Sequence, residues 1–169
     1  LMEYLDGTLR DYIKRNNDQL SRKERVGLVR QIFKAMQYLH TEGLLHRDLS
    51  PDNILLKKYD SCQVVKLSDF GLVKLPESQL TTRDTVMKGS FNDPRLEEEG
   101  FANYCLWHEM YALTLIVHFV MTGRENRSNI VPEWRDFVAK GMNAQKELRY
   151  KSVAEMRSAF EETLKKLVD

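Results

Sequence analysis

The chain has 169 residues, of which 42% are hydrophobic and 30% are charged, and its net charge at pH 7 is +1. These values predict one folded domain with a hydrophobic core, and they give no reason to expect nucleic acid as a partner. Cys62 and Cys105 lack metal-ligand spacing, and no apolar run is long enough to suggest membrane contact. We see no signal peptide and expect a cytoplasmic protein. Because the chain opens with Leu-Met-Glu-Tyr, we interpret it as a fragment of a longer protein.

The N-terminal part predicts the end of a strand followed by a short helix. Residues 1–7 are mainly apolar and finish with a glycine, which is typical of a strand that runs into a turn. Thr8 can accept a hydrogen bond from the first turn of a helix. We therefore expect a short helix over residues 9–16, with its apolar side chains on one face.

A longer helix is predicted next. Ser21 and Glu24 have the spacing of a capping box, which starts a helix. Apolar side chains then recur at helical spacing to about Thr41, and Gly43 is expected to end the helix. The apolar stripe consists of Val26, Val29, Ile32, Phe33, Met36 and Leu39.

The middle of the chain predicts a β-ribbon and a long loop. Residues 54–56 and 64–67 are strand-like, and the polar link over residues 57–63 is typical of a turn. Residues 69–93 show no sustained periodicity. A loop of that length inside a compact domain is usually functional.

The remaining sequence predicts helices. Pro94 can begin a short helix that carries Glu97–Glu99, which we interpret as a solvated face. The strongly apolar residues 103–122 predict a central buried helix that ends at a glycine. Two more helices are expected over residues 132–143 and 152–167. The last one begins with a second capping box, formed by Ser152 and Glu155.

Two short polar motifs interrupt the β-like sequence in the middle of the chain. An HRD motif ends at Asp48, Asn53 follows five residues later, and a DFG motif begins at Asp69. Phosphoryl transfer needs a carboxylate that aims the acceptor hydroxyl and hard oxygen ligands for Mg²⁺. Asp48 can supply the first, and Asn53 with Asp69 can supply the second. Leu55, on the neighbouring strand, would offer an apolar face to a purine.

Together these motifs resemble the C-terminal lobe of a eukaryotic-type Ser/Thr protein kinase, of the sort that also occurs in bacteria. The resemblance covers essentially residues 1–169. It implies a mainly α fold, namely the helical bundle of a kinase C-lobe with a small β ribbon that carries the catalytic and metal loops. Residues 1–7 look like the hinge, where the backbones of Glu3 and Leu5 would meet the adenine of ATP.

The resemblance also implies roles for the polar residues. Asp48 would be the catalytic base, and Asn53 and Asp69 would hold Mg²⁺. Arg47 would pair with a phosphate on the activation loop, because a guanidinium binds phosphate well. Glu109 lies near the position where the family has an aspartate that anchors the catalytic loop. The candidate phosphorylation sites are Ser78, Thr81, Thr82 and Thr85.

Some residues depart from the family pattern. Ser50 stands where Ser/Thr kinases usually have a lysine that steadies the transferring phosphate, within the catalytic loop. Residues 93–95 read Asp-Pro-Arg where Ala-Pro-Glu is expected. The family's buried Glu–Arg pair with Arg149 would then be absent, or another acid such as Glu97 or Glu98 would replace it.

We therefore expect the parent protein to transfer phosphate from ATP to Ser or Thr of a protein substrate. The chain has no Gly-rich phosphate loop and no strand lysine, so its missing partner would be the N-terminal lobe of the same protein, and the fragment alone would be inactive. A pseudokinase that binds or scaffolds is the first alternative, because of Ser50 and residues 93–95. A small-molecule phosphotransferase is the second, although Arg47 and Gly71 argue against it.

Overall fold

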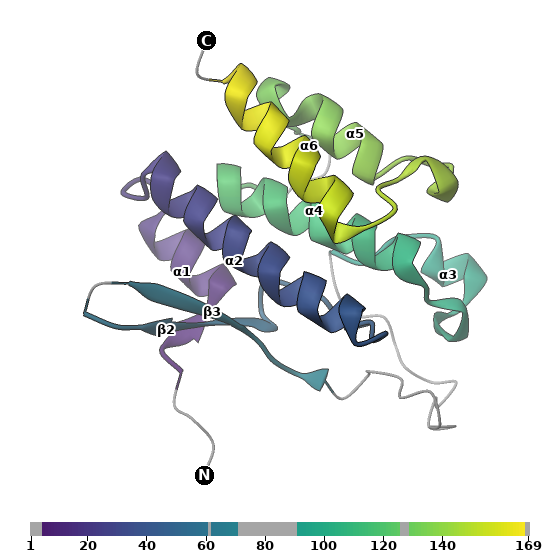
Figure 1. Ribbon diagram of the computed structural model, residues 1–169, viewed down its shortest axis with the longest axis horizontal. Helices are drawn as coiled ribbons and strands as arrows, with labels where there is room; N and C mark the ends of the chain where they lie inside the picture. Colours follow the sequence, from purple (N-terminus) through teal and green to yellow (C-terminus); the bar gives the residue numbers. More distant parts are fainter. Residues whose placement is uncertain (1–4, 61, 71–90, 126–128, 168–169) are drawn as a thin grey trace.

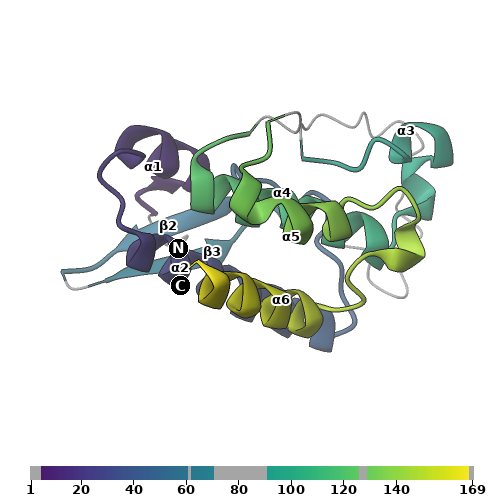
Figure 2. The same cartoon turned by 90° about the horizontal axis from the view of Figure 1, so that it is seen from above.

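A computed structural model describes residues 5–60, 62–70, 91–125 and 129–167. Helices form the bulk of the molecule, and a small antiparallel sheet lies against one side of them (Figure 1). Viewed at right angles, α2 and α6 lie side by side (Figure 2), and the two helices are in contact. The predicted mainly α architecture with a β ribbon is confirmed.

The N-terminal elements are β1 (Gly7–Thr8), α1 (Leu9–Asn16) and α2 (Arg22–Thr41). The two helices begin and end where local capping predicts. The strand differs from the prediction, because it includes Gly7, where a turn was expected, and residues 5 and 6 are not part of it. The Thr8 hydroxyl accepts a hydrogen bond from the Asp11 N–H at 3.1 Å. Ser21 and Glu24 make both halves of the capping box, so two otherwise unpaired N–H groups are satisfied at the start of α2. Gly43, at φ +72°, takes the left-handed conformation just beyond α2.

The sheet has the order β1-β2-β3 within the described residues, and both pairings are antiparallel. The second and third strands, β2 (Ile54–Lys58) and β3 (Gln63–Leu67), are each longer than predicted. Gln31 of α2 closes the outer edge of β3. Its side-chain amide donates to the Gln63 carbonyl at 2.9 Å and accepts from the Val65 N–H at 3.0 Å. These two hydrogen bonds give partners to backbone groups of the edge strand that would otherwise be unpaired.

The C-terminal part contains both α-helices and short 3₁₀ turns. Its elements are α3 (Leu96–Glu99), η2 (Phe101–Asn103), α4 (Leu106–Thr122), η3 (Pro132–Trp134), α5 (Arg135–Gly141), η4 (Lys146–Leu148) and α6 (Val153–Lys166). The central helix begins at Leu106 instead of 103, because Cys105 has the extended conformation of an N-cap. At the start of α6, Ser152 caps the Glu155 N–H as expected. The Glu155 carboxylate accepts from Lys151 instead of from Ser152, so the second capping box is only half formed.

The core surrounds α4. Every residue from His108 to Val120 is buried, because α2 and α5 pack against this helix. A helix that is apolar on all sides is stable in water only when neighbours cover it, as the sequence predicted. Across the part of the chain that the structure describes, no helix combines the length and apolar character needed to cross a bilayer.

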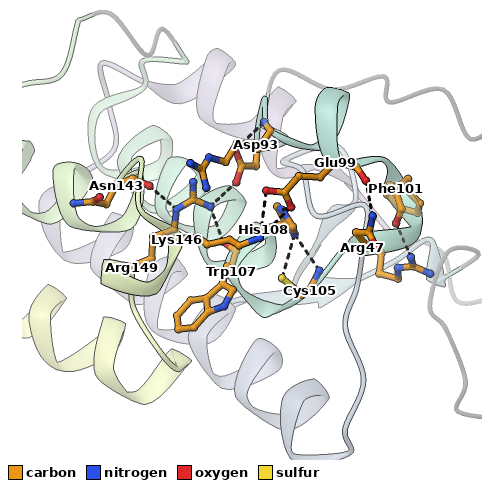
Figure 3. A network of polar contacts seen from close by, with 12 residues as sticks. Arg47, Asp93, Glu99, Phe101, Cys105, Trp107, His108, Asn143, Lys146 and Arg149 are labelled. Atoms are coloured by element: carbon orange, nitrogen blue, oxygen red, sulfur yellow. Dashed lines mark hydrogen bonds and ion pairs between the residues drawn. The ribbon is translucent and has the colours of Figure 1, made fainter.

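A buried ion pair joins the region before α3 to the region before α6. Arg149 pairs with Asp93, and the two residues are 2% and 1% exposed. The same guanidinium donates to the carbonyls of Asn143 and Trp107 at 2.9 and 3.0 Å (Figure 3). The pair is therefore not absent, and another acid replaces the expected glutamate, as the second alternative predicted, but this acid is neither Glu97 nor Glu98. The shorter Asp93 side chain takes the role, two positions before the expected glutamate.

The acidic run of α3 is also not wholly a solvated face. Glu97 and Glu98 are exposed, as predicted. Glu99 differs, because its carboxylate contacts Lys146 Nζ at 3.1 Å and His108 Nε2 at 3.2 Å (Figure 3). The ion pair with Lys146 lowers the pKa of Glu99 and keeps the carboxylate ionised. Glu99 therefore ties α3 to α4 and to η4.

Two helical glycines give opposite predictions for stability. A methyl group on Gly141 would lie 1.9 Å from the Thr114 hydroxyl oxygen, whereas one on Gly27 would meet nothing within 4 Å. Gly141→Ala should lower the free energy of unfolding by about 1–3 kcal/mol through overpacking between α4 and α5. Gly27→Ala should raise it by about 0.5–1 kcal/mol, since alanine favours helix. Urea denaturation of both variants measures the contrast, and equal stabilities would contradict it.

Candidate active site

The backbone of the HRD motif is held by one buried carboxylate. Glu109 of α4 is fully buried, and its two oxygens accept the N–H groups of His46 and Arg47, each at 3.0 Å. His40 Nε2 lies 2.8 Å from one of these oxygens, and the Tyr104 hydroxyl donates to the other at 3.2 Å. Arg47 has φ +67°, a strained conformation for a side chain of its size. The carboxylate therefore stabilises a loop conformation that the backbone alone would not favour.

The sequence suggested Glu109 as the anchor of this loop, and the contacts confirm that role. It did not suggest His40 or Tyr104 as partners of the carboxylate. His40 lies 69 positions before Glu109. Tyr104 is only five residues away, but it precedes α4, so helical spacing does not connect the two residues. Burial, followed by the Glu109 charge, raises the pKa of Tyr104 well above its usual value, so its hydroxyl stays a donor.

Asp48 and Asn53 lie directly against each other. The Asn53 side-chain amide donates to the Asp48 backbone carbonyl at 2.8 Å and to its carboxylate Oδ2 at 2.9 Å. The Asn53 N–H in turn donates to the Ser50 carbonyl at 3.1 Å, which closes a tight turn. These bonds fix the orientation of the Asp48 carboxylate, which is half-buried.

The surroundings of Asp48 make its carboxylate more basic. Burial is the largest cause and raises its pKa, because a low dielectric disfavours the charged form. The hydrogen bond from Asn53 and the nearby His46 oppose this shift, whereas the charges of Asp69 and Asp52 add to it. The raised pKa is the change expected for a carboxylate that takes a proton from a hydroxyl.

The segment that carries Asp69 is fastened to the catalytic loop at Ser68. The Ser68 N–H and hydroxyl both donate to the Asn53 carbonyl, at 2.9 and 3.1 Å, and the Ser68 carbonyl lies 2.9 Å from His46 Nε2. The rings of His46 and Phe70 are 5.3 Å apart. Asp69, between these contacts, is exposed and has φ +58°. The fold thus brings Asp48, Asn53 and Asp69 to one end of the ribbon formed by β2 and β3.

The oxygen atoms of Asn53 and Asp69 at this end of the ribbon suit magnesium. Both hydrogen bonds from the Asn53 side chain use its nitrogen, so Oδ1 is the atom that it offers to a cation. Asp69 adds a carboxylate, and Mg²⁺ in phosphotransfer sites takes one or two such oxygens and completes its shell with water and phosphate. The described residues hold no cluster of three or more His, Cys, Asp or Glu side chains that could bind a metal. A two-ligand site of this kind does not need one.

Two of the three residues expected around the adenine lie within the described part of the chain. Leu55 is half-buried between the buried Ile54 and Leu56, so it points to the sheet face opposite the helical core. Leu5 is also half-buried, and the next residue, Asp6, donates its N–H to the Leu56 carbonyl at 2.9 Å. Glu3 lies outside the described residues.

The Arg47 side chain packs against η2 and the residue that follows it. Its guanidinium donates to the Phe101 carbonyl at 3.0 Å (Figure 3). The guanidinium also lies 4.6 Å from the centre of the Phe101 ring and 5.8 Å from the centre of the Tyr104 ring. It is only 5% exposed. The expected pairing with a phosphate stays a prediction, because Ser78, Thr81, Thr82 and Thr85 lie outside the described residues.

This fold and this loop geometry define a class of protein. The chain matches the protein kinase domain family over residues 1–169, so it belongs to that family. Within the family it resembles Ser/Thr kinases of the eukaryotic type that occur in bacteria. It is 36% identical over 126 residues to the probable serine/threonine-protein kinase PknB of Lactococcus lactis, an alignment that covers 73% of this chain and 19% of that protein. It is 32% identical over 127 residues to the serine/threonine-protein kinase PrkC of Bacillus subtilis, with the same coverage.

Solved structures give the same fold. A crystal structure of the Rad53 kinase domain and SCD2 in complex with AMPPNP has a TM-score of 0.66 to this chain and 22% sequence identity. The match covers 93% of this chain and 66% of that one. The chain spans about 19% of the length of the PknB and PrkC proteins, so these relatives contain much more than the region described here.

The Glu109 anchor yields a stability prediction. Glu109→Gln should lower the free energy of unfolding by about 2–3 kcal/mol, because the glutamine NH2 that replaces one carboxylate oxygen cannot accept an N–H and leaves a buried donor unpaired. Glu109→Asp keeps a carboxylate and should cost less, with the remaining loss due to its shorter reach. Thermal and urea unfolding of the two variants give the order. A Glu109→Gln protein as stable as the wild type would contradict the anchoring role.

Proposed function

We propose that the protein carrying this chain transfers the γ-phosphate of ATP to Ser or Thr residues of protein substrates. The observation that carries this proposal is the direct hydrogen bond between Asn53 and Asp48, on a loop that Glu109 holds in place. It joins a residue suited to hold Mg²⁺ to a carboxylate suited to accept a proton. Membership of the protein kinase family supports the same reaction.

In this proposal each residue has one task. Asp48 accepts the proton of the substrate hydroxyl as that oxygen attacks phosphorus, and its raised pKa favours this step. Asn53 and Asp69 hold Mg²⁺, which neutralises charge on the phosphates. Leu55, with the backbones of Glu3 and Leu5, receives the adenine. The phosphate-covering groups of the N-terminal lobe come from the same protein, so this chain contributes one half of the site.

The assignment of Asp48 can be tested in the full-length protein. Asp48→Asn should lower phosphate transfer from labelled ATP to a Ser/Thr peptide library by about 100-fold or more, because the general base is lost. The apparent KM for ATP should change little, since Asp48 does not hold the nucleotide. Asp60→Asn, an exposed aspartate in the link between β2 and β3, is the matched control and should keep wild-type activity. Equal transfer by the Asp48→Asn and wild-type proteins would reject Asp48 as the base.

A pseudokinase is the second candidate, and Ser50 is the observation that favours it. This residue occupies the catalytic loop position where the family usually has a lysine, so a cation that would steady the phosphate is missing there. Such a protein would keep the fold and could bind nucleotide without transferring phosphate. Nucleotide binding and transfer must therefore be measured separately.

Binding of Mg²⁺ and ATP gives a second test. At a concentration 100 times its Kd, Mg²⁺–ATP should raise the free energy of unfolding of the full-length protein by about 2.7 kcal/mol. Asp69→Asn should remove the magnesium-dependent part of this gain and leave the fold intact, because asparagine tolerates the positive φ of this position. Thermal shifts with ATP, with and without Mg²⁺, provide the measurement. An unchanged magnesium effect in Asp69→Asn would overturn the metal assignment, and a normal shift without phosphate transfer would favour the pseudokinase.

A further inference from the structure

Four charged side chains form a cluster beside the catalytic loop. Arg10 of α1 donates from Nε to Asp52 Oδ1 at 2.8 Å and also pairs with Glu125, in the segment after α4. Lys14, one turn further along α1, lies 3.1 Å from Glu125 Oε1. The cluster therefore contains two cations and two carboxylates, which balance each other.

The cluster lies close to the proposed base. Asp52 follows Asp48 by four residues in the same loop, and the negative charge of Asp52 contributes to the raised pKa of Asp48. The Arg10 N–H donates to the Pro51 carbonyl at 3.1 Å, so α1 is attached to the loop by its backbone as well. Asp52 is therefore close to the point where a substrate hydroxyl would meet Asp48.

The Arg10 side chain lies between Asp52 and Glu125 and pairs with both carboxylates. Its side chain is 19% exposed, whereas the Asp52 side chain is 53% exposed. Its guanidinium lies 5.4 Å above the ring of Phe91, a residue that is 2% exposed. Although partial burial raises the pKa of Glu125, the hydrogen bonds from Arg10 and Lys14 outweigh it and lower this pKa, so Glu125 stays ionised.

Without Arg10, Asp52 would lose its ion-pair partner and Glu125 would keep only Lys14, so the cluster would carry a net negative charge beside the catalytic loop. Such a charge attracts the Lys and Arg side chains of a peptide, because opposite charges at an interface select partners. With Arg10 in place, a basic residue of the substrate must displace an ion pair that already exists. The balanced cluster therefore gives a basic peptide no net advantage.

We propose that Arg10 is a specificity-determining residue that occupies the acidic site formed by Asp52 and Glu125 and so removes a preference for basic residues near the phosphorylated Ser or Thr. This inference rests on the proposed function, because a preference among peptide substrates matters only if the protein phosphorylates peptides. It can nevertheless be tested by peptide binding alone, without phosphate transfer. An inactive protein would then reject the proposed function and leave the binding result to decide on Arg10.

The wild-type protein gives the first result. The probes are a Ser peptide with two Arg residues beside the Ser and the same peptide with Gln in their place, titrated into the full-length protein in low salt by calorimetry. Their Kd values should agree within about twofold, since the cluster is neutral. Tighter binding of the Arg peptide by tenfold or more would show that the acidic site is open and would overturn the proposal.

The variants give the second result. Arg10→Gln should make the Arg peptide bind about fivefold more tightly relative to the Gln peptide, which is the gain expected for a partly exposed ion pair. Arg10→Lys, which keeps the charge, should restore the wild-type ratio. The Arg10→Gln/Asp52→Asn double variant should lose the gain, because one of the two carboxylates is neutralised. An unchanged ratio in a folded Arg10→Gln protein would reject the proposal.

A matched control separates this effect from a general loss of charge. Arg30 makes a bidentate ion pair with Glu161 between α2 and α6, at 2.8 and 2.7 Å. Arg30→Gln removes the same charge and a comparable carboxylate contact. It should leave the peptide ratio unchanged, and an equal shift in Arg30→Gln would show that net charge, not the Asp52–Glu125 site, is responsible.

Discussion

The arrangement of the site depends on one buried carboxylate. Glu109 sits on the most deeply buried helix and holds the backbone of the catalytic loop by two N–H groups, while two side chains complete its hydrogen bonds. A carboxylate in the core is costly unless donors surround it. Two of these donors are backbone N–H groups of the loop, so the loop must keep its conformation for the buried charge to stay fully hydrogen-bonded. Any change that frees the loop also removes the two backbone donors from the buried charge.

Two acidic side chains differ in length from what kinase resemblance leads one to expect. An aspartate is expected at the loop anchor, and Glu109 stands there. A glutamate is expected opposite Arg149, and Asp93 stands there, two residues earlier in the chain. In both places a negative charge is kept although the side chain that carries it differs from the expected one. The charge is thus the strict requirement, because a buried cation or a row of buried N–H groups cannot be left without an acceptor.

Local sequence was enough to predict most helix ends and the presence of the ribbon. Thr8 and Ser21 cap the first two helices as predicted, and the central helix ends at Gly123 in the left-handed conformation. Such signals depend on neighbours within one turn, so no tertiary information is needed to read them. The sequence pattern predicts the start of the central helix three residues too early, because apolar residues before Cys105 continue the pattern although the backbone there is not α-helical.

The sequence by itself determined the family. It also showed that the motifs containing Asp48, Asn53 and Asp69 resemble a phosphotransfer site, because all three residues lie within one short stretch of the chain. Only the tertiary structure decided which charged residues meet. Arg149 joins Asp93 across 56 residues, and Arg10 joins Glu125 across an even longer separation. Ion pairs between distant segments leave no periodic signal in the sequence. They form because packing of the helices brings particular charges together where water is scarce.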